Sequence, residues 1–424
     1  MRSLAASLVV SLSLLVPSAH ANTWVVDDTP GPGVDFPSIA LAMTVALPGD
    51  VFIVRAGNYS GFTLQVGAVI LCETGVFVTG DIEVSNVPGG NHAALVNLTA
   101  ETIRIDQCTG GVLLEDVVAR PGTFAPGQTA LVSISNSIDV RLRNVDVDLI
   151  QRGAAAASVV SSRVEISTSR LIGGAGRSHH AILFPPPPEP GGDGLVISGA
   201  SDVHVSRTDA RGGVGGDLPA SFTCACLVAA PGGFGIRVGP AANLLLTGSS
   251  TSLIKGGSGG VGQDCPYDGA PGNGIVISSG GSARISGATV SGESPRTFCG
   301  GSPVLPVIGA YTVPSSPEPT LRVTGTPLAG APVTFTLSGT PGATARFSFG
   351  RNFAITDVPF VAEDILTTPI RFFDMGVIPP SGEISLTIPL PGYLPRGFLV
   401  VAQGRTDSAS IGMSLSPSAA ITLR

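Results

Sequence analysis

Two stretches, VLLEDVVA (112–119) and VRLRNVDV (140–147), carry the pattern that decides the fold. In each, apolar residues alternate with other residues, a polar residue interrupts, and the alternation resumes. Weaker copies follow at four further places: VEISTSRL (164–171), VHVSRTDA (203–210), LLLTGSST (244–251) and ARISGATV (283–290). Alternation with period two is typical of β-strands, because successive side chains point to opposite faces.

The spacing of these copies predicts stacked coils. They start 28, 24, 39, 41 and 39 residues apart, so the strand portions stay alike while the connections vary in length. A second apolar residue lies six positions before four of the starts, at Ile134, Ile197, Val238 and Ile277. One coil of short strands cannot bury its own apolar residues, whereas stacked coils bury them in ladders. We therefore expect an all-β chain with a parallel β-helix at 65–301; a sandwich, the main alternative, would not require this near-constant register.

Residues 22–64 predict an N-terminal cap and the first coil. WVVDD (24–28) is expected to form a strand, and residues 38–46 a short helix with Ser38 as its N-cap. GDVFIVRAGNYSGFTL (49–64) then begins the first coil. A polar cap is what the open end of a solenoid requires.

The run DFPSIALAMTVALPGDVFIVRAGNYSG (35–61) resembles the opening of right-handed parallel β-helix proteins of the pectin-lyase-like superfamily. Those proteins begin with a strand, a helix entered at Ser-Ile, a PGD turn and a strand ending in xGxY. The resemblance covers about residues 24–300 and implies the right-handed β-helix fold. It implies no single activity, because that superfamily contains lyases, hydrolases, epimerases, adhesins and many non-enzymes.

The last third of the chain predicts a second domain. Residues 302–318 are Pro-rich and nearly uncharged, which is typical of a linker. Residues 319–424 alternate strand-like stretches with Gly/Pro turns, which predicts a small β-sandwich with six or seven strands. This segment resembles the C-terminal sandwich-like modules of large secreted bacterial β-helix proteins, including those of Planctomycetes.

Composition and the N-terminus predict an exported protein. Gly and Pro make up 57 and 35 of 424 residues, only 12% are charged, and the net charge is −7 with a single lysine. That balance excludes the basic stripe of a nucleic-acid binder. Residues 1–21 have a positive start, an apolar run and Ala19-His20-Ala21, the pattern of a signal peptide. No later run is long enough for a membrane span, so we expect an extracellular or cell-surface location.

Export makes disulfides the default for the six cysteines, which are Cys72, Cys108, Cys224, Cys226, Cys265 and Cys299. The alternatives are a metal site or free thiols, but Cys224-Ala-Cys226 lacks the CxxC spacing of a zinc site. Matching offsets in three loops favour Cys224–Cys265 with Cys226–Cys299, which leaves Cys72 to pair with Cys108. Six cysteines allow 15 pairings, so these remain expectations.

One column of side chains is predicted to point outward from successive coils. Its members are Leu113, Arg141, Glu165, His204, Leu245 and Arg284. Arg141, Glu165, His204 and Arg284 are the candidate ligand-binding residues, because such a face suits a polyhydroxylic or polyanionic chain. The alternative is a solvated face with an ion pair worth ~0–1 kcal/mol. Loops at 173–193 and 212–233 would wall a groove over this column.

Two features suggest calcium weakly, and no other cofactor is expected. Asn144, Asp146 and Asp148 alternate with apolar residues and would face outward together, as Ca²⁺ ligands or as the carboxylate pair of a hydrolase. GGVGGD (212–217) and GGVGQD (259–264) match the start of a Ca²⁺-binding nonapeptide, but proline stands where it needs a large apolar residue. We interpret both as Gly-rich corner loops.

The function predicted from sequence is structural, adhesive or carbohydrate-binding, and non-catalytic. No GxSxG, HExxH or P-loop motif is present, and the polygalacturonase-type motifs are missing. The expected partners are an extracellular polysaccharide or other surface proteins, with no nucleic acid. The alternative is a polysaccharide lyase or glycoside hydrolase acting on an acidic glycan, with Arg141 or Arg284 as the base of a lyase.

Overall fold

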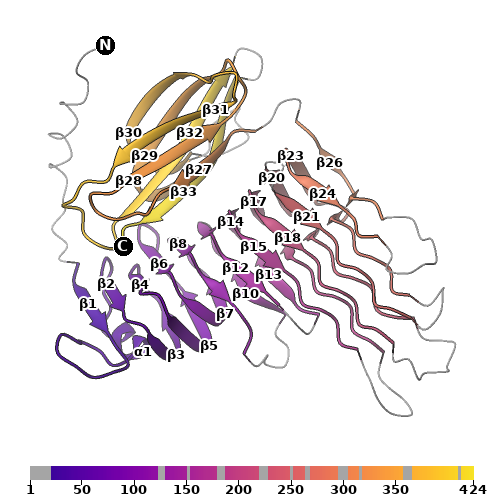
Figure 1. Cartoon of the computed structure of the whole chain (residues 1–424), viewed down its shortest axis with the longest axis horizontal. Coiled ribbons are helices and arrows are strands. Elements are labelled where there is room, and N and C mark those ends of the chain that lie inside the picture. The colour runs from indigo at the N-terminus through magenta and orange to yellow at the C-terminus, as the bar shows by residue number, and fades with distance from the viewer. Residues whose placement is uncertain are drawn as a thin grey trace.

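The structure is a computed structural model that describes residues 21–122, 129–149, 153–178, 187–218, 228–248, 252–262, 268–294, 304–314, 318–356, 365–408 and 412–424. Large parallel sheets form a β-helix, and antiparallel sheets at the C-terminal end form a sandwich (Figure 1). The predicted all-β fold, a parallel β-helix followed by a small sandwich, is confirmed.

The predicted cap is present at the start of the β-helix. Strand β1 (Thr23–Val26) pairs with β2 (Val51–Val54), and helix α1 (Ile39–Met43) lies between them in sequence. Ser38 is the N-cap, since its Oγ accepts a hydrogen bond from the Leu41 amide at 3.2 Å. The helix buries Ile39 and Ala42 against the end of the core and ends at Met43, earlier than expected, with Thr44 as its C-cap.

The first face of the β-helix is an 11-stranded parallel sheet, here called sheet A. After β1 and β2 its order is β4 (Val69–Cys72), β6 (His92–Val96), β8 (Gly111–Glu115), β11 (Val140–Arg143), β14 (Arg163–Ser167), β17 (Asp202–Ser206), β20 (Asn243–Thr247), β23 (Ser282–Ser286) and β26 (Tyr311–Thr312). The starts of the sequence copies pair in the predicted register: Val112, Val140, Val164, Val203, Leu244 and Ala283.

A 15-stranded sheet supplies the other faces of the β-helix. Its long strands are β3 (Gly57–Leu64), β5 (Val76–Ser85) and β7 (Thr99–Asp106). One branch continues through β9 (Val118–Ala119), β12 (Asp146–Asp148), β15 (Arg170–Ile172), β18 (Asp209–Arg211), β21 (Leu253–Lys255) and β24 (Thr289–Ser291). The other continues through β10 (Ala130–Ser135), β13 (Ala155–Val160), β16 (Leu195–Ser198), β19 (Ile236–Val238), β22 (Ile275–Ile277) and β25 (Val307–Ile308).

Apolar ladders fill the interior of the coils. Along sheet A one ladder consists of Phe52, Ile70, Leu95, Leu114, Leu142, Ile166, Val205, Leu246 and Ile285, all buried. The predicted second ladder, Ile134, Ile197, Val238 and Ile277, is also present, with Val159 between the first two. Each burial removes apolar surface from water, which is the main stabilising term of the fold.

A single residue with positive φ turns the chain after many sheet A strands. Asp116, Asn144, Thr168 and Arg207 occupy this corner with φ of 49–55°. The amide of Asp116 donates to the Arg143 carbonyl of the next coil at 3.0 Å, and the amide of Asn144 donates to Ser167 in the same way. The corner therefore continues the hydrogen bonding between coils while it changes the chain direction.

The Gly-rich connections are ordered extended segments and not simple corner loops. We call residues 173–178, 187–194, 211–218, 228–235, 255–262 and 268–274 the glycine fin, which runs side by side away from the strands in Figure 1. The Gly213 amide donates to the Gly192 carbonyl (2.7 Å), and the Gly213 carbonyl accepts from the Gly233 amide (2.9 Å). A Cβ on Gly213 would lie 2.0 Å from the Gly174 carbonyl oxygen, so backbones touch directly. Glycines recur in the pattern GGxGGx, and a three-residue period is that of a polyproline II helix.

The β-helix extends further than predicted. Strands β25 and β26 pair with β22 and β23, so residues 307–312 belong to a last partial coil and not to the linker. Their hydrogen bonding to the preceding coil outweighs the extended preference of the Pro-rich sequence around them.

The described residues of the sandwich form two sheets with seven strands in all, within the predicted six or seven. One sheet has the order β27 (Thr320–Thr324), β28 (Pro332–Ser338), β31 (Glu383–Pro389). The other has the order β30 (Ile365–Val377), β29 (Thr344–Thr356), β32 (Leu399–Ser408), β33 (Gly412–Thr422). Phe335 and Phe347 lie in the core between them.

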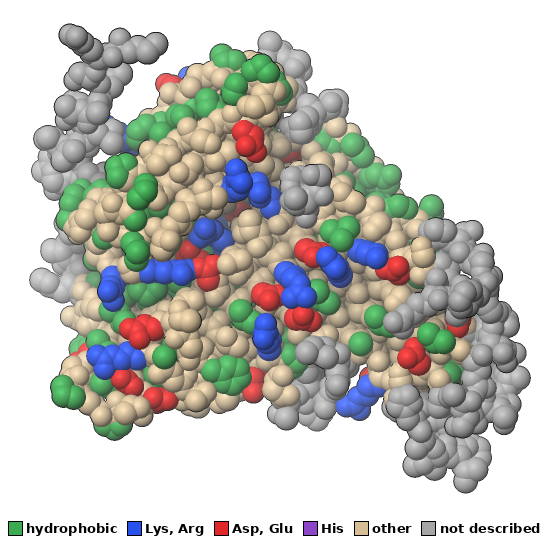
Figure 2. Space-filling view, viewed as in Figure 1, with side chains coloured by type: hydrophobic (Ala, Val, Ile, Leu, Met, Phe, Trp, Pro, Cys, Tyr) green, Lys and Arg blue, Asp and Glu red, His purple; other side chains and the backbone are tan. Residues whose placement is uncertain are grey.

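The sandwich packs on the outer face of sheet A. Val401 and Ala420 contact Leu71, Ala94 and Leu113 in one apolar cluster. At its edge the Thr422 amide donates to Glu115 (3.0 Å), and Arg424 forms an ion pair with Asp116. The surface shown in Figure 2 has acidic and basic side chains interspersed. Arg170 forms ion pairs with Asp146 and Asp148.

Candidate functional site

The predicted outward column is present in the predicted register. Leu113 pairs with Arg141, Arg141 with Glu165, Glu165 with His204, His204 with Leu245, and Leu245 with Arg284, and Thr312 follows in β26. Neighbouring strands of a sheet lie ~4.8 Å apart. The four candidate ligand-binding residues therefore lie along one line on the outside of sheet A.

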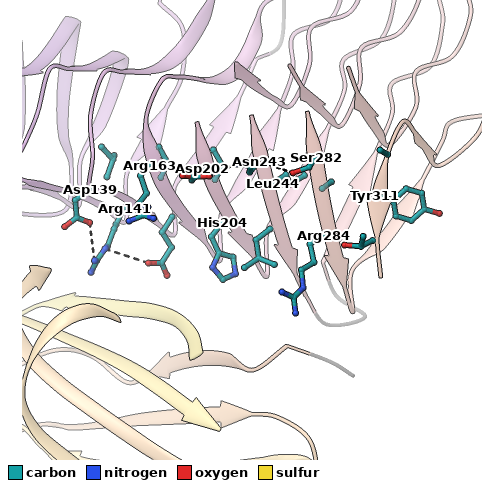
Figure 3. Close-up of a pocket in the computed structure, with 18 residues that line it drawn as sticks. Asp139, Arg141, Arg163, Asp202, His204, Asn243, Leu244, Ser282, Arg284 and Tyr311 are labelled. Atoms are coloured by element: carbon teal, nitrogen blue, oxygen red, sulfur yellow. Dashed lines mark hydrogen bonds and ion pairs between the residues drawn. The ribbon is translucent and has the colours of Figure 1, made fainter. Parts of the chain in front are cut away.

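A groove of about 600 Å³ lies over the C-terminal part of this column. A second column, two residues earlier in each strand, lines it as well (Figure 3): Asp139, Arg163, Asp202, Asn243 and Ser282. The sequence analysis missed this second column. Its signal was present, because the register that aligned the first column also aligns residues two positions earlier.

Three members of the second column form a hydrogen-bonded ladder. Ser282 Oγ donates to Asn243 Oδ1 at 2.6 Å, and Asn243 Nδ2 donates to Asp202 Oδ1 at 2.9 Å. All three side chains are exposed to the groove. The ladder presents donors and acceptors in a fixed order along the coil axis, with their partners on neighbouring strands.

The inner end of the groove is buried and charged. Arg141 is 4% exposed and forms ion pairs with Asp139 (3.2 Å) and with Glu165 (3.8 Å). Glu165 is 6% exposed, and its Oε2 accepts a hydrogen bond from Ser418 of the sandwich at 2.8 Å. The expectation of a solvated ion pair is therefore wrong for this pair, because the sandwich covers it. Burial raises the pKa of Glu165 to about 7, against the opposing effects of Arg141 and Ser418.

The remaining candidates lie further along the groove. His204 is half-buried, and its Nε2 lies 2.9 Å from Thr247 Oγ1. Burial lowers the pKa of His204 to about 3, so the ring is neutral at neutral pH. Arg284 is 37% exposed and forms an ion pair with Glu318, in the segment that leads to the sandwich. The column thus combines a neutral imidazole, an apolar Leu245 and a paired guanidinium.

The walls of the groove differ from the expected ones. No residue of 173–193 or 212–233 lines it, because the described parts of these segments leave the coil from the other faces and form the glycine fin. The sandwich faces the groove instead (Figure 3). Its Ser418 donates a hydrogen bond to Glu165. The prediction that these connections fold over sheet A is therefore wrong. The spacing of the repeats gives the length of a connection, but it does not show from which face of the coil the connection leaves.

The weak calcium candidates are not brought together. Asn144 occupies the corner with positive φ, and its Nδ2 donates to Asp116 Oδ1 at 2.5 Å. Asp146 and Asp148 both bind the Arg170 guanidinium, at 3.0 and 2.9 Å. Within the described residues no cluster of three or more His, Cys, Asp or Glu side chains is suited to a metal ion. The expected shared face is wrong, because the turn at Asn144 separates it from the strand.

The cysteine predictions divide into two groups. Cys72 and Cys108 are buried free thiols, so the expected bond between them is wrong. Cys72 is on β4, while the Cys108 thiol donates to the Asp106 carbonyl at 3.4 Å, and burial raises the pKa of both thiols. Cys224, Cys226, Cys265 and Cys299 lie outside the described residues, and their pairing stays a prediction.

Together the fold and the groove define an all-β protein in which a parallel β-helix carries a groove beside a packed sandwich. Among the described residues, no helix has the length and apolar character needed to cross a bilayer. Comparison with protein-family models finds no match, and no curated protein or solved structure matches the chain either.

Proposed function

We propose that this chain is an exported, non-catalytic protein that binds an extracellular polysaccharide in the groove on sheet A. The observation that carries the proposal is the exposed ladder of Asp202, Asn243 and Ser282 along a groove of about 600 Å³. Sugar hydroxyls both donate and accept hydrogen bonds, and the ladder offers carboxylate, amide and hydroxyl groups at the spacing of strands. Such a protein would have an adhesive or structural role at the cell surface or outside the cell.

The side chains of the groove support binding more than catalysis. A lyase that removes a proton with Arg141 or Arg284 needs a free guanidinium, whereas both form ion pairs with carboxylates. His204 is neutral and held by Thr247. These residues are therefore proposed to orient a bound chain.

Export and ancestry belong to the same proposal. Residues 1–21 act as a signal peptide, and the mature chain begins at Asn22. We assign the β-helix to the pectin-lyase-like superfamily, supported by the cap at Ser38 and by the coil register. The sandwich is proposed to be related to the C-terminal modules of secreted bacterial proteins such as those of Planctomycetes.

The test is glycan-array binding by mature protein, residues 22–424, beside two matched variants. Asp202→Ala removes a carboxylate from the groove, and Asp209→Ala removes one from β18, where Asp209 pairs with Arg211. We expect binding by the mature protein and by Asp209→Ala, with a loss of about tenfold in affinity for Asp202→Ala. Equal binding by both variants would place the glycan elsewhere.

A glycoside hydrolase, or less readily a lyase, is the alternative function, and one observation favours it. Glu165 lines the groove, and its pKa is raised to about 7, so it holds a proton near neutral pH as a general acid must. Asp202 on the neighbouring strand would then serve as the second carboxylate. Release of reducing ends or of unsaturated products from polygalacturonate, abolished in Glu165→Gln, would establish the enzyme.

A further inference from the structure

We infer that the groove accepts the end of a glycan chain and not an internal stretch, because the sandwich closes one end of the groove. This inference rests on the proposed glycan binding and adds the class of ligand, a free chain terminus. Three observations on the described residues support it: the cover over the N-terminal strands, the exposed last coil and the chemistry of the closed end.

The sandwich covers the outward column on the N-terminal side of the groove. Ala94 and Leu113, which precede Arg141 in the column, are 4% and 0% exposed and contact Ala420 and Val401. A chain lying along the column from the C-terminal side therefore meets the sandwich where Ser418 binds Glu165.

The outward side chains of sheet A beneath the sandwich form a permanent interface with it. The outward residues change from apolar, at Ala94 and Leu113, to charged at Arg141 and Glu165, at the edge of the sandwich. Apolar side chains would be costly on a face that opens to water, while they stabilise a permanent interface. The closed end is therefore a fixed part of the site and not a gate.

The other end of the groove is open. Strand β26 is the last strand of sheet A, and both of its residues, Tyr311 and Thr312, are exposed. Thr312 pairs with Arg284 and continues the outward column into β26, whereas Tyr311 pairs with Ala283 and its ring points away from the column, beyond the last coil (Figure 3). Among the described residues no strand of sheet A follows β26, so the remainder of a polymer can leave the groove past the last coil.

The closed end holds polar groups suited to a terminal sugar. Asp139 and Arg163 line it, and Glu165 adds a buried carboxyl group whose Oε1 has no hydrogen-bond partner among the described residues. Asp139 and Arg163 face the groove and can bind the hydroxyl groups of a terminal sugar, whereas Glu165 Oε1 is covered by protein. Internal sugars cannot lie there, since both of their neighbours in the chain need space.

The experiment compares short and long chains of the same repeat. Mature protein is titrated with xylohexaose, mannohexaose, laminarihexaose, maltohexaose and hexagalacturonate, each beside the parent polymer at equal sugar mass. A protein that binds chain ends has a capacity that follows the number of ends. We expect binding capacity per unit mass to be more than tenfold higher for the hexamer of the bound repeat. Partial acid hydrolysis of the polymer should raise its capacity in proportion to the new ends.

Each result separates the two proposals. Equal capacity per unit mass for hexamer and polymer would overturn chain-end recognition and leave glycan binding standing. Binding to none of the pairs would overturn the proposed function and this inference with it.

A pair of matched variants locates the terminal sugar. Arg163→Ala alters the closed end, and Arg170→Ala removes an arginine from the next strand of the same coil, on a different face. We expect Arg163→Ala to lower the affinity for the bound hexamer about tenfold and Arg170→Ala to leave it unchanged. Equal affinities for all three proteins would contradict a terminal-sugar site at the closed end.

Discussion

The body of the β-helix and the glycine fin stack the same coils in two different ways. In the body, buried side chains such as Leu114 and Leu142 form ladders, and the backbones lie a strand spacing apart. In the fin, Gly213 and Gly233 have no side chains, and their backbones contact one another directly. The body is stabilised by removal of apolar surface from water, and the fin by hydrogen bonds and close contact between backbones.

The comparison teaches that a repeat keeps its register while its packing changes. Each coil needs apolar residues where it crosses the body. Where the same coil enters the fin, its contact positions accept only glycine, because a Cβ there would collide with a carbonyl group of a neighbouring segment. The body should therefore tolerate exchanges between apolar side chains of similar size, and the fin should tolerate no side chain at its contact positions.

The largest expected effect comes from breaking the body. Leu114→Ala removes a fully buried side chain from the sheet A ladder and leaves a cavity between coils. We expect the free energy of unfolding to fall by about 2–5 kcal/mol, measured by thermal or urea denaturation. Leu114→Met keeps most of the volume and serves as the control, with an expected loss below about 1.5 kcal/mol. Similar losses for both variants would mean that the interior is not packed as described.

A smaller effect is expected from breaking the fin. Gly213→Ala places a Cβ 2.0 Å from the Gly174 carbonyl oxygen, so neighbouring segments must move apart. We expect a loss of about 1–3 kcal/mol and faster cleavage of the fin by proteases. Val214→Ala, at the adjacent half-exposed position, is the matched control and should change little. An unchanged Gly213→Ala protein would rule out direct backbone contact in the fin.

A third test concerns Glu165, an outward side chain of the body that the sandwich covers. It asks whether the carboxyl group titrates as a buried group does. The pKa of Glu165 is raised from 4.5 to about 7 in the folded chain, so the folded state holds its proton more tightly than the unfolded state. This contribution to stability is complete below pH ~4.5 and is lost as the pH rises through about 7.

Glu165→Gln removes that titration. The difference in unfolding midpoint between Glu165→Gln and the parent should therefore shift in favour of the variant as the pH is raised from about 4 to about 8. Midpoints measured across this range by calorimetry check the prediction. A difference that stays constant, or that moves the other way, would show that Glu165 is not buried by the sandwich.

The smallest effect is expected on an uncovered face of the body. Arg170 binds Asp146 and Asp148, but its side chain is 44% exposed. We expect Arg170→Ala to change the free energy of unfolding by about 0–1 kcal/mol, and less at high salt. Denaturation at two salt concentrations measures this, and a loss above about 2 kcal/mol would mean that the exposed charges stabilise the coils as strongly as the fin does.

Much of the β-helix was predictable from sequence, because its signals are local. Alternation and the polar interruption place Val112, Val140 and Val164 in register, and Ser38 caps the helix as expected. The fin was misread as corner loops, although the GGxGGx pattern carries a three-residue period. The disulfide expected between Cys72 and Cys108 is contradicted by two buried thiols.

The candidate site was predictable only in part. Arg141, Glu165, His204 and Arg284 were found as one column, because a strand register is a property of the sequence repeat. The second column with Asp202 and Asn243 followed from the same register but was not recognised, and the wall formed by the sandwich had no sequence signal. Ser418 is 253 residues away from Glu165 in the chain, so their contact depends on the docking of two domains.

The sequence by itself determined the stacking of coils, since the period of apolar residues specifies which side chains face inward and which face outward. Only the tertiary structure decided which outward residues meet water. The sandwich covers Leu113 and buries Glu165, while Asp202 and Asn243 stay exposed in the groove. The physical reason is that burial on an outer face depends on what packs against it, and that partner comes from a distant part of the chain.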